Sequence, residues 1–256
     1  MTTQNGPAAG GWLQSFSPNT KAGVRLFCFP YAGGNAAVYR GWSRKLPAGV
    51  ELLAVQLPGR AGRMHEPPVS ELPRLVDAMA PSLAPHCEGA FAFFGPSMGA
   101  MIAFELARRL RREGRALPLH VFVSGRSAPQ LNRSHKLIHN LPEPELIEEL
   151  KHLNGTPREV LEHPELMELM LPILRADFSV CDTYEYREEP PLDCPITAFG
   201  GLQDSGVPRA NLEAWREQTS AAFMLRMLPG DHFFLHSNES LLLRLLASEL
   251  HRPAGR

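Results

Sequence analysis

The sequence predicts a three-layer α/β domain, in which helices cover both faces of a mostly parallel sheet. Short apolar runs of four to seven residues alternate with segments of helical length over nearly the whole chain. Such a rhythm favours parallel strands, because each helix returns the chain to the same edge of the sheet. A length of 256 residues suits one domain of this kind with a single well-buried core.

The expected strands are the apolar runs, and the expected helices are the longer segments between them. The strands are predicted at residues 24–29, 50–55, 90–94, 119–123, 196–199 and 222–228. The helices are predicted at residues 36–46, 70–83, 98–112, 208–218 and 236–250. In the third helix, apolar residues recur every four positions from Met98 to Leu110 and line one face.

Three further segments complete the predicted organisation. Residues 1–23 are rich in Gly, Pro, Ser and Asn without a hydrophobic period and predict a flexible N-terminal arm. Residues 24–250 form the domain, and residues 251–256 a C-terminal tail. Within the domain, residues 129–190 contain helix-like pieces but no convincing strand. A structureless loop of that length would be improbable, so we predict an inserted helical lid over a binding cleft.

The composition excludes several classes of protein. A net charge of −1 gives no single-sign field that would attract nucleic acid or a membrane surface. No apolar run approaches the roughly 20 residues of a membrane span, and MTTQNGPAAGGWLQ lacks the layout of a secretory signal. We therefore expect a cytoplasmic protein. The four cysteines show no CxxC pair and are interpreted as buried or incidental thiols: Cys28, Cys87, Cys181 and Cys194.

A GxSxG pattern at residues 95–99 follows an expected strand and opens an expected helix. Chance supplies the pattern in roughly one chain in ten of this length, so its context matters more than its letters. The two glycines permit a tight strand-to-helix turn that presents the hydroxyl of Ser97 to a cleft. The same turn places the Met98 N–H where it donates to a developing oxyanion. The alternative is a glycine-rich helix entry without chemistry.

A serine nucleophile needs a base and an acid, which are expected later in the chain in the order acid, then base. His232 is preferred among ten histidines because it lies between the last expected strand and the last expected helix. Asp204 is the preferred acid, since it follows the strand at residues 196–199. Asp231 is too close to His232 in sequence to reach its ring, and Asp193 precedes its strand and so lies at the wrong edge of the sheet.

The loop FPYAGG at residues 29–34 follows the first expected strand and predicts a second oxyanion donor, because glycines let backbone N–H groups face the cleft. Neither GxGxxG nor GxxxxGK[ST] occurs, so a nucleotide site is disfavoured. His232 and His236 form an HxxxH pair, but the glutamate of HExxH is absent and no third ligand offers itself. We expect no metal site.

With these pieces aligned, the chain resembles the type II thioesterases, the stand-alone editing hydrolases of modular polyketide synthases and nonribosomal peptide synthetases. The resemblance runs from about residue 24 to residue 250 and implies the α/β-hydrolase fold. It rests on the segments FCFPYAGGNAAVYRGW (Phe27–Trp42), VQLPGRAGR (Val55–Arg63), FFGPSMGA (Phe93–Ala100), VFVSGRSAP (Val121–Pro129), RADFSVCDTYEY (Arg175–Tyr186) and GDHFFLH (Gly230–His236). One departure is Pro96, which stands where the family usually has histidine.

The resemblance implies a catalytic triad of Ser97, Asp204 and His232, with the N–H groups of Ala32 and Met98 as oxyanion hole. It implies a substrate acyl group linked as a thioester to the phosphopantetheine arm of an acyl or peptidyl carrier protein. We expect that the chain has no cofactor of its own and that the protein is a monomer. The alternatives are an esterase for free small molecules, a chain-releasing fatty acyl thioesterase, or a non-catalytic carrier-binding adaptor. A triad by itself does not distinguish a thioester from an oxygen ester.

Two segments allow a functional or a structural interpretation. The arginines of residues 107–115 either meet an acidic carrier protein or form the solvated end of a helix. The leucines and methionines of residues 166–174 either line an adaptable acyl pocket or pack the lid helices together.

Overall fold

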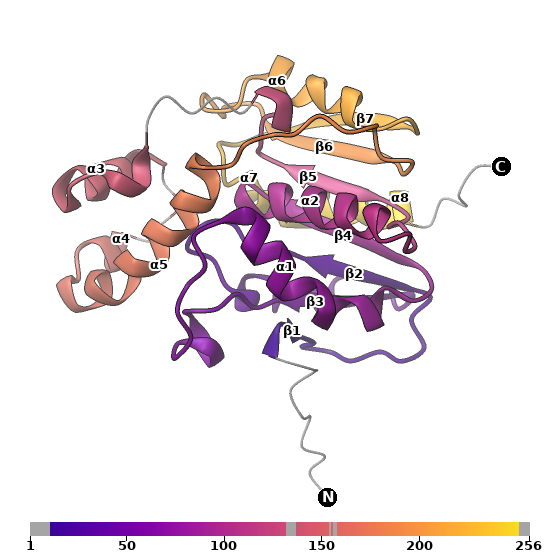
Figure 1. Ribbon diagram of the computed structural model, residues 1–256, viewed down its shortest axis with the longest axis horizontal. Coiled ribbons are helices and arrows are strands. Elements are labelled where there is room, and N and C mark those ends of the chain that lie inside the picture. The colour runs from indigo at the N-terminus through magenta and orange to yellow at the C-terminus, as the bar shows by residue number, and fades with distance from the viewer. Residues whose placement is uncertain (1–10, 132–136, 154, 156–157, 251–256) are drawn as a thin grey trace, which may run out of the picture.

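The computed structural model describes residues 11–131, 137–153, 155 and 158–250. Its centre is a seven-stranded sheet with the order β1-β3-β2-β4-β5-β6-β7, in which all neighbours are parallel except β1 and β3 (Figure 1). The strands are β1 (Leu13–Gln14), β2 (Val24–Cys28), β3 (Val50–Val55), β4 (Phe91–Pro96), β5 (Val121–Ser124), β6 (Ile196–Gly201) and β7 (Phe223–Leu228).

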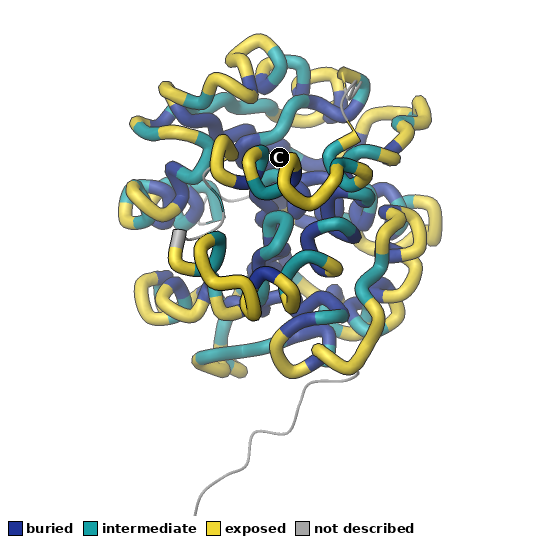
Figure 2. The backbone as a smooth tube through the Cα atoms, turned by 90° about the vertical axis from the view of Figure 1, so that its left-hand side faces the viewer, coloured by how far each residue is buried: buried dark blue, intermediate teal, exposed yellow. Residues whose placement is uncertain are grey.

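Helices cover both faces of the sheet, as the alternation of strands and helices predicts. One face packs against α1 (Leu72–Leu83), α2 (Met98–Arg112) and α6 (Arg209–Glu213). The other face packs against α7 (Phe234–Ser237) and α8 (Glu239–Leu250). Buried residues gather inside the fold and exposed ones along its outer turns (Figure 2). No helix in the described part of the chain has the length and apolar content to span a membrane.

The central strands read as continuous apolar runs because both of their faces are buried. In β4, Phe91 and Phe93 pack into the core on one face, while Ala92 and Phe94 pack into the core on the other. Alternate side chains of a strand point to opposite faces, so a strand covered on both sides is apolar at most of its positions.

The prediction of a flexible arm over residues 1–23 is wrong for its described part. Strand β1 pairs antiparallel with the edge of β3, with Leu13 opposite Val55. Trp12 is 6% exposed, and the guanidinium of Arg63 lies 4.0 Å from its ring centroid. The short strand therefore pairs the carboxyl end of β3, at Ala54 and Val55, which would otherwise be an open edge. Residues 1–10 and the predicted tail at residues 251–256 lie outside the described residues.

Some expected helices are divided in the structure. The segment predicted as one helix over residues 36–46 forms two short 3-10 helices, η2 (Ala36–Tyr39) and η3 (Trp42–Arg44). The segment over residues 208–218 forms α6 followed by the 3-10 helix η8 (Ala214–Gln218). Tighter 3-10 turns are common in short connecting pieces, and sequence periodicity does not separate them from an α-helix.

Between β5 and β6, the described residues form a helical lid whose α-helices are α3 (Glu143–Leu153), α4 (Arg158–Leu161) and α5 (Pro164–Asp182). None of its described residues between 129 and 190 belongs to a strand. The lid stands beside the layered sheet and has its own apolar cluster (Figure 1). The buried members of that cluster are Leu146, Leu150, Met167, Leu174 and Phe178.

The arginines at the end of α2 are paired within the chain. Arg108, which is 3% exposed, lies 2.6 Å from the Glu105 carboxylate. Arg111 and Arg112 lie 2.6 and 2.8 Å from the carboxylate of Glu189, in the segment that leads to β6. These pairs anchor α2 to that segment, so the contacts favour a structural role for the arginine run.

Candidate active site

Ser97 lies on the turn between β4 and α2 with φ 51° and ψ −113°. A residue other than glycine rarely adopts positive φ, and such strain persists only where the surroundings enforce it. A Cβ atom on Gly95 would lie 2.0 Å from the Gly99 carbonyl oxygen, and one on Gly99 would lie 2.6 Å from the Phe29 carbonyl oxygen. Both glycines of GxSxG are therefore required sterically, as the motif predicts.

Pro96 is accommodated at the end of its strand. It is the last residue of β4 and is buried. The hydrogen bond that joins this point to β5 is donated by the Ser97 N–H to the Ser124 carbonyl oxygen, at 2.8 Å. Proline has no N–H to contribute, and this bond does not need one.

His232 and Asp204 form a close pair. The Nδ1 atom of His232 lies 2.8 Å from Oδ2 of Asp204, whose side chain is 3% exposed. The other oxygen of Asp204 accepts hydrogen bonds from the N–H groups of Gly206 and Val207, at 2.9 and 3.2 Å. Because the carboxylate only accepts, Nδ1 carries the imidazole proton, and Nε2 is left to act as a base.

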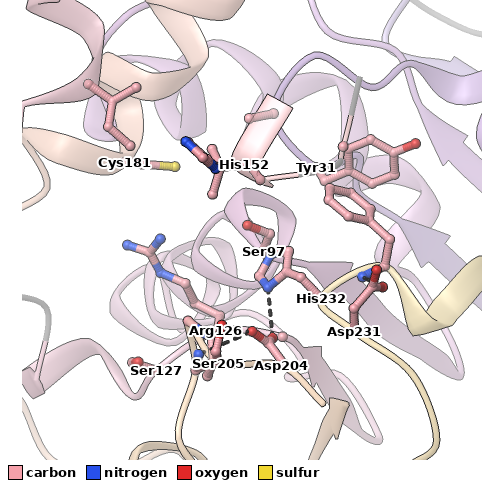
Figure 3. A pocket seen from close by; sticks show the side chains of 18 of the residues that line it. Tyr31, Ser97, Arg126, Ser127, His152, Cys181, Asp204, Ser205, Asp231 and His232 are labelled. Carbon is pink, nitrogen blue, oxygen red and sulfur yellow. Dashed lines mark hydrogen bonds and ion pairs between the residues drawn. The ribbon is translucent and has the colours of Figure 1, made fainter. Parts of the chain in front are cut away.

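The three predicted triad residues line one cavity of about 520 Å³, in which the His232 ring lies between the side chains of Ser97 and Asp204 (Figure 3). Each follows the carboxyl end of a strand: β4, β6 or β7. Gly125 follows β5 beside the His232 ring, and its φ of 57° lies in the left-handed region that favours glycine. The sheet thus gathers residues that lie far apart in sequence.

The two expected oxyanion donors belong to different elements of the site. Met98 is the first residue of α2, so its N–H has no partner within the helix. Ala32 lines the same cavity as Ser97. It belongs to a turn closed by a 2.9 Å hydrogen bond from the Gly34 N–H to the Tyr31 carbonyl oxygen, with Gly33 at φ 77°. Glycine at the third position with this φ defines a type II turn.

The residues rejected as triad members have other contacts. Asp231 accepts a 2.9 Å hydrogen bond from the Phe233 N–H and so shapes the turn before His232. Asp193 precedes β6 and lies 3.4 Å from the Ser220 hydroxyl. His236 contacts the hydroxyl of Tyr31 at 3.2 Å, and burial lowers the pKa of its imidazole. Among the described residues, no group of three or more His, Cys, Asp or Glu side chains has the arrangement of a metal site.

The lid supplies the upper wall of the cavity through α3 and α5. Of the leucines and methionines in residues 166–174, Leu174 lines the cavity, whereas Leu169 is 64% exposed. Most of them pack within the lid cluster, and the interpretation as an acyl pocket stays a prediction for Leu174. Cys181 also lines the cavity, and burial raises the pKa of its thiol to about 11. At neutral pH this cysteine is a protonated thiol.

Two buried charged residues beside the site were not singled out from the sequence. Arg60, in the loop after β3, and Asp177, on α5, form a double hydrogen bond with N···O distances of 2.6 and 2.7 Å. Asp177 also accepts a 2.7 Å hydrogen bond from the Gly33 N–H. The available signal was an aspartate within an apolar helix, because a buried carboxylate requires partners.

The nucleophile turn, the His–Asp pair and the helical lid on a parallel sheet define a serine hydrolase of the α/β-hydrolase fold. The chain belongs to the thioesterase family: the family model described as "Thioesterase domain" matches residues 24–250.

Comparison with known proteins agrees with this membership. The linear gramicidin dehydrogenase LgrE of Brevibacillus parabrevis is 48% identical over 93% of this chain and 92% of its own. The gramicidin S biosynthesis protein GrsT of Aneurinibacillus migulanus is 46% identical over 93% of each chain. The solved structure of the type II thioesterase BorB from the borrelidin biosynthetic cluster superposes with a TM-score of 0.87, at 37% identity, over 94% of this chain and 98% of BorB. The name of LgrE denotes a dehydrogenase, but the present chain has no GxGxxG motif.

Proposed function

We propose that the protein is a stand-alone type II thioesterase that hydrolyses acyl thioesters on the phosphopantetheine arm of acyl or peptidyl carrier proteins. The observation that carries the proposal is the His232–Asp204 pair beside Ser97, in a cavity under a helical lid. The similarity to GrsT and BorB supports the choice of substrate. GrsT is named for gramicidin S biosynthesis, and BorB is described as a type II thioesterase of the borrelidin biosynthetic cluster. Removal of aberrant or stalled acyl groups is the corresponding role.

In the first half of the reaction, the Ser97 hydroxyl attacks the thioester carbonyl while Nε2 of His232 takes its proton. Asp204 holds the imidazole in the required tautomer and stabilises its cation. The carbonyl oxygen becomes an oxyanion that accepts hydrogen bonds from the N–H groups of Ala32 and Met98. The intermediate collapses, the carbon–sulfur bond breaks, and the thiol of the arm departs with the proton from His232.

In the second half, a water molecule replaces the thiol. His232 takes a proton from the water as it attacks the acyl-enzyme carbonyl, and the same two N–H groups stabilise the second oxyanion. Collapse returns the proton to Ser97 and releases a free carboxylic acid. The chain's own residues supply every proton transfer in this cycle.

The cavity fits an acyl chain of modest size. Its volume of about 520 Å³ lies within the usual range for small-molecule sites. Leu150, Leu174 and Phe178 contribute apolar wall from the lid. An acyl group therefore gains from the removal of apolar surface from water, while the phosphopantetheine arm reaches in from the carrier.

Intact-mass measurement on a panel of acylated carrier proteins tests the proposal. The protein is expected to remove the acyl group and leave the free phosphopantetheine thiol, and Ser97→Ala is expected to leave the acyl mass unchanged. A clear preference for simple aryl esters over acyl carriers would instead indicate an esterase. Failure of a serine-reactive phosphonate to label Ser97 in the folded protein would indicate a non-catalytic adaptor.

We also propose that the protein acts as a monomer in the cytoplasm. In the part of the chain that the structure describes, the four cysteines are buried and form no disulfide, which suits a reducing compartment. Size-exclusion chromatography with light scattering is expected to give the mass of one chain, 28.3 kDa. A dimer mass at micromolar concentration would contradict the monomer.

A further inference from the structure

The lid helix α5 contacts the turn that carries the expected oxyanion donor Ala32. A Cβ atom on Gly33 would lie 2.8 Å from Cδ2 of Leu174, so the turn packs directly against the helix. Leu174, Asp177 and Cys181 are spaced three and four residues apart and therefore share one face of α5. The face that closes the cavity is the face that touches the oxyanion turn.

Asp177 joins this helix to the turn by hydrogen bonds. Its Oδ2 atom accepts from the Gly33 N–H at 2.7 Å and from Nη1 of Arg60 at 2.6 Å. Nη2 of Arg60 donates to Oδ1 at 2.7 Å, and Nη1 of Arg60 also lies 3.2 Å from the Gly34 carbonyl oxygen. The Asp177 and Arg60 side chains are 2% and 5% exposed. A carboxylate buried this deeply is stable only with partners of this kind.

The geometry of the turn connects these bonds to catalysis. The Tyr31 carbonyl oxygen accepts from Gly34, inside the turn. In a trans peptide the N–H points opposite to the C=O, so the N–H of Ala32 points out of the turn. Ala32 also borders the cavity that contains Ser97. Asp177 holds the next peptide, between Ala32 and Gly33, in its type II orientation.

We propose that Asp177, held in place by Arg60, is a positioning residue that fixes the Ala32 N–H in the oxyanion hole, an inference that rests on the proposed serine hydrolase mechanism. Asp177 does not touch the reacting atoms and acts through Gly33. An oxyanion donor must be in place before charge develops, because preorganisation is the source of its effect. The lid helix thus sets the geometry of the transition state as well as the wall of the cavity.

Two double variants separate positioning from stability. Asp177→Leu with Arg60→Met replaces the buried ion pair by apolar side chains of similar size, an exchange that buried pairs often tolerate without loss of stability. It removes the acceptor of the Gly33 N–H. Asp177→Asn with Arg60→Gln also removes both charges, but the asparagine carbonyl oxygen still accepts from Gly33. The two variants therefore differ in whether the side chain at position 177 accepts a hydrogen bond from the Gly33 N–H.

The measurements are kcat, KM and the inhibition constant of a straight-chain alkyl trifluoromethyl ketone. Ser97 adds to the ketone carbon, His232 takes the hydroxyl proton, and the ketone oxygen becomes an oxyanion in the same hole. For the leucine–methionine variant, kcat is expected to fall about 10- to 100-fold and the inhibition constant to rise by a similar factor, with KM within about twofold of the native value. The asparagine–glutamine variant is expected to keep most of the native kcat and most of the native affinity for the ketone.

A control variant uses a second, partly buried carboxylate that is also paired with an arginine. Glu105 accepts from Nη1 of Arg108 at 2.6 Å and from the Tyr184 hydroxyl at 2.7 Å, away from the cavity. Glu105→Gln is expected to lower the melting temperature while kcat and ketone affinity stay within about threefold of the native values. Titration with a serine-reactive phosphonate counts the folded sites, so kcat is expressed per reactive Ser97 in every variant.

The proposal is overturned if the folded leucine–methionine variant keeps native kcat and ketone affinity, or if both double variants lose them equally. A fall in kcat without weaker ketone binding would also contradict it. Failure of the mechanism itself has a different signature, namely that the native protein neither turns over thioester nor reacts with the phosphonate. The two failures are therefore distinguishable.

Discussion

The Nδ1 atom of His232 lies 2.8 Å from Oδ2 of Asp204, although the two residues are 28 positions apart and follow different strands. Asp204 is further held by two backbone N–H groups of its own loop. The carboxylate therefore orients the imidazole from a position that is itself fixed, which is the arrangement a general base requires.

Replacement of Asp204 by Asn is expected to lower kcat by about 10⁴-fold. The side-chain amide donates where the carboxylate accepted, so the imidazole adopts the tautomer that leaves no base toward Ser97. Steady-state hydrolysis of an acyl thioester measures the effect. Asp193→Asn, at the opposite edge of the sheet, serves as control and is expected to retain activity. A loss below about tenfold at Asp204 would exclude it as the triad acid.

Gly95→Ala is expected to destabilise the fold by about 4 kcal/mol or more, because its Cβ would lie 2.0 Å from the Gly99 carbonyl oxygen. Urea denaturation followed by circular dichroism gives the free energy of unfolding. Gly41→Ala is the matched control, since no heavy atom lies within 4 Å of its added Cβ and its φ is −69°. The control is expected to change stability by less than about 1 kcal/mol. Equal effects at the two glycines would contradict the steric account of the turn.

Trp12→Ala is expected to lower the free energy of unfolding by about 3 kcal/mol. The residue is 6% exposed and stacks with Arg63 at the edge of the sheet, so its removal uncovers apolar surface. The exposed Met64→Ala is expected to change stability by less than about 0.5 kcal/mol. A flexible arm, by contrast, would give no difference between the two variants in urea denaturation.

Cys181 is expected to resist iodoacetamide in the native protein at pH 8, although it lines the active-site cavity. Burial raises the pKa of this thiol to about 11. Only about one molecule in a thousand then carries the reactive thiolate at pH 8, and the fraction grows as the pH rises. The intact mass after alkylation gives the number of modified cysteines, and the urea-unfolded protein is the fully modified reference. Rapid native modification at pH 8 would show that the thiol is activated instead.

Local patterns predicted much of the fold because local physics controls those features. Continuous apolar runs predicted the buried parallel strands, and proline-separated helical pieces predicted the lid. The prediction of an arm before residue 24 was wrong because the partner of Trp12 and Leu13 is a sheet edge about 40 residues away, opposite Val55. Residues 1–23 are polar and glycine-rich on average, and this average conceals two adjacent apolar residues.

Ser97 and its two glycines were predictable from the sequence alone, because a GxSxG pattern between an apolar run and an amphipathic helix is typical of this strand-to-helix turn. The order of strands also predicted Asp204 and His232, since the carboxyl ends of parallel strands meet at one edge. Only the tertiary structure brought Arg60 and Asp177, 117 positions apart, onto the turn beside Ala32. Their contact depends on how α5 packs against a distant loop, and no periodicity or motif encodes that packing.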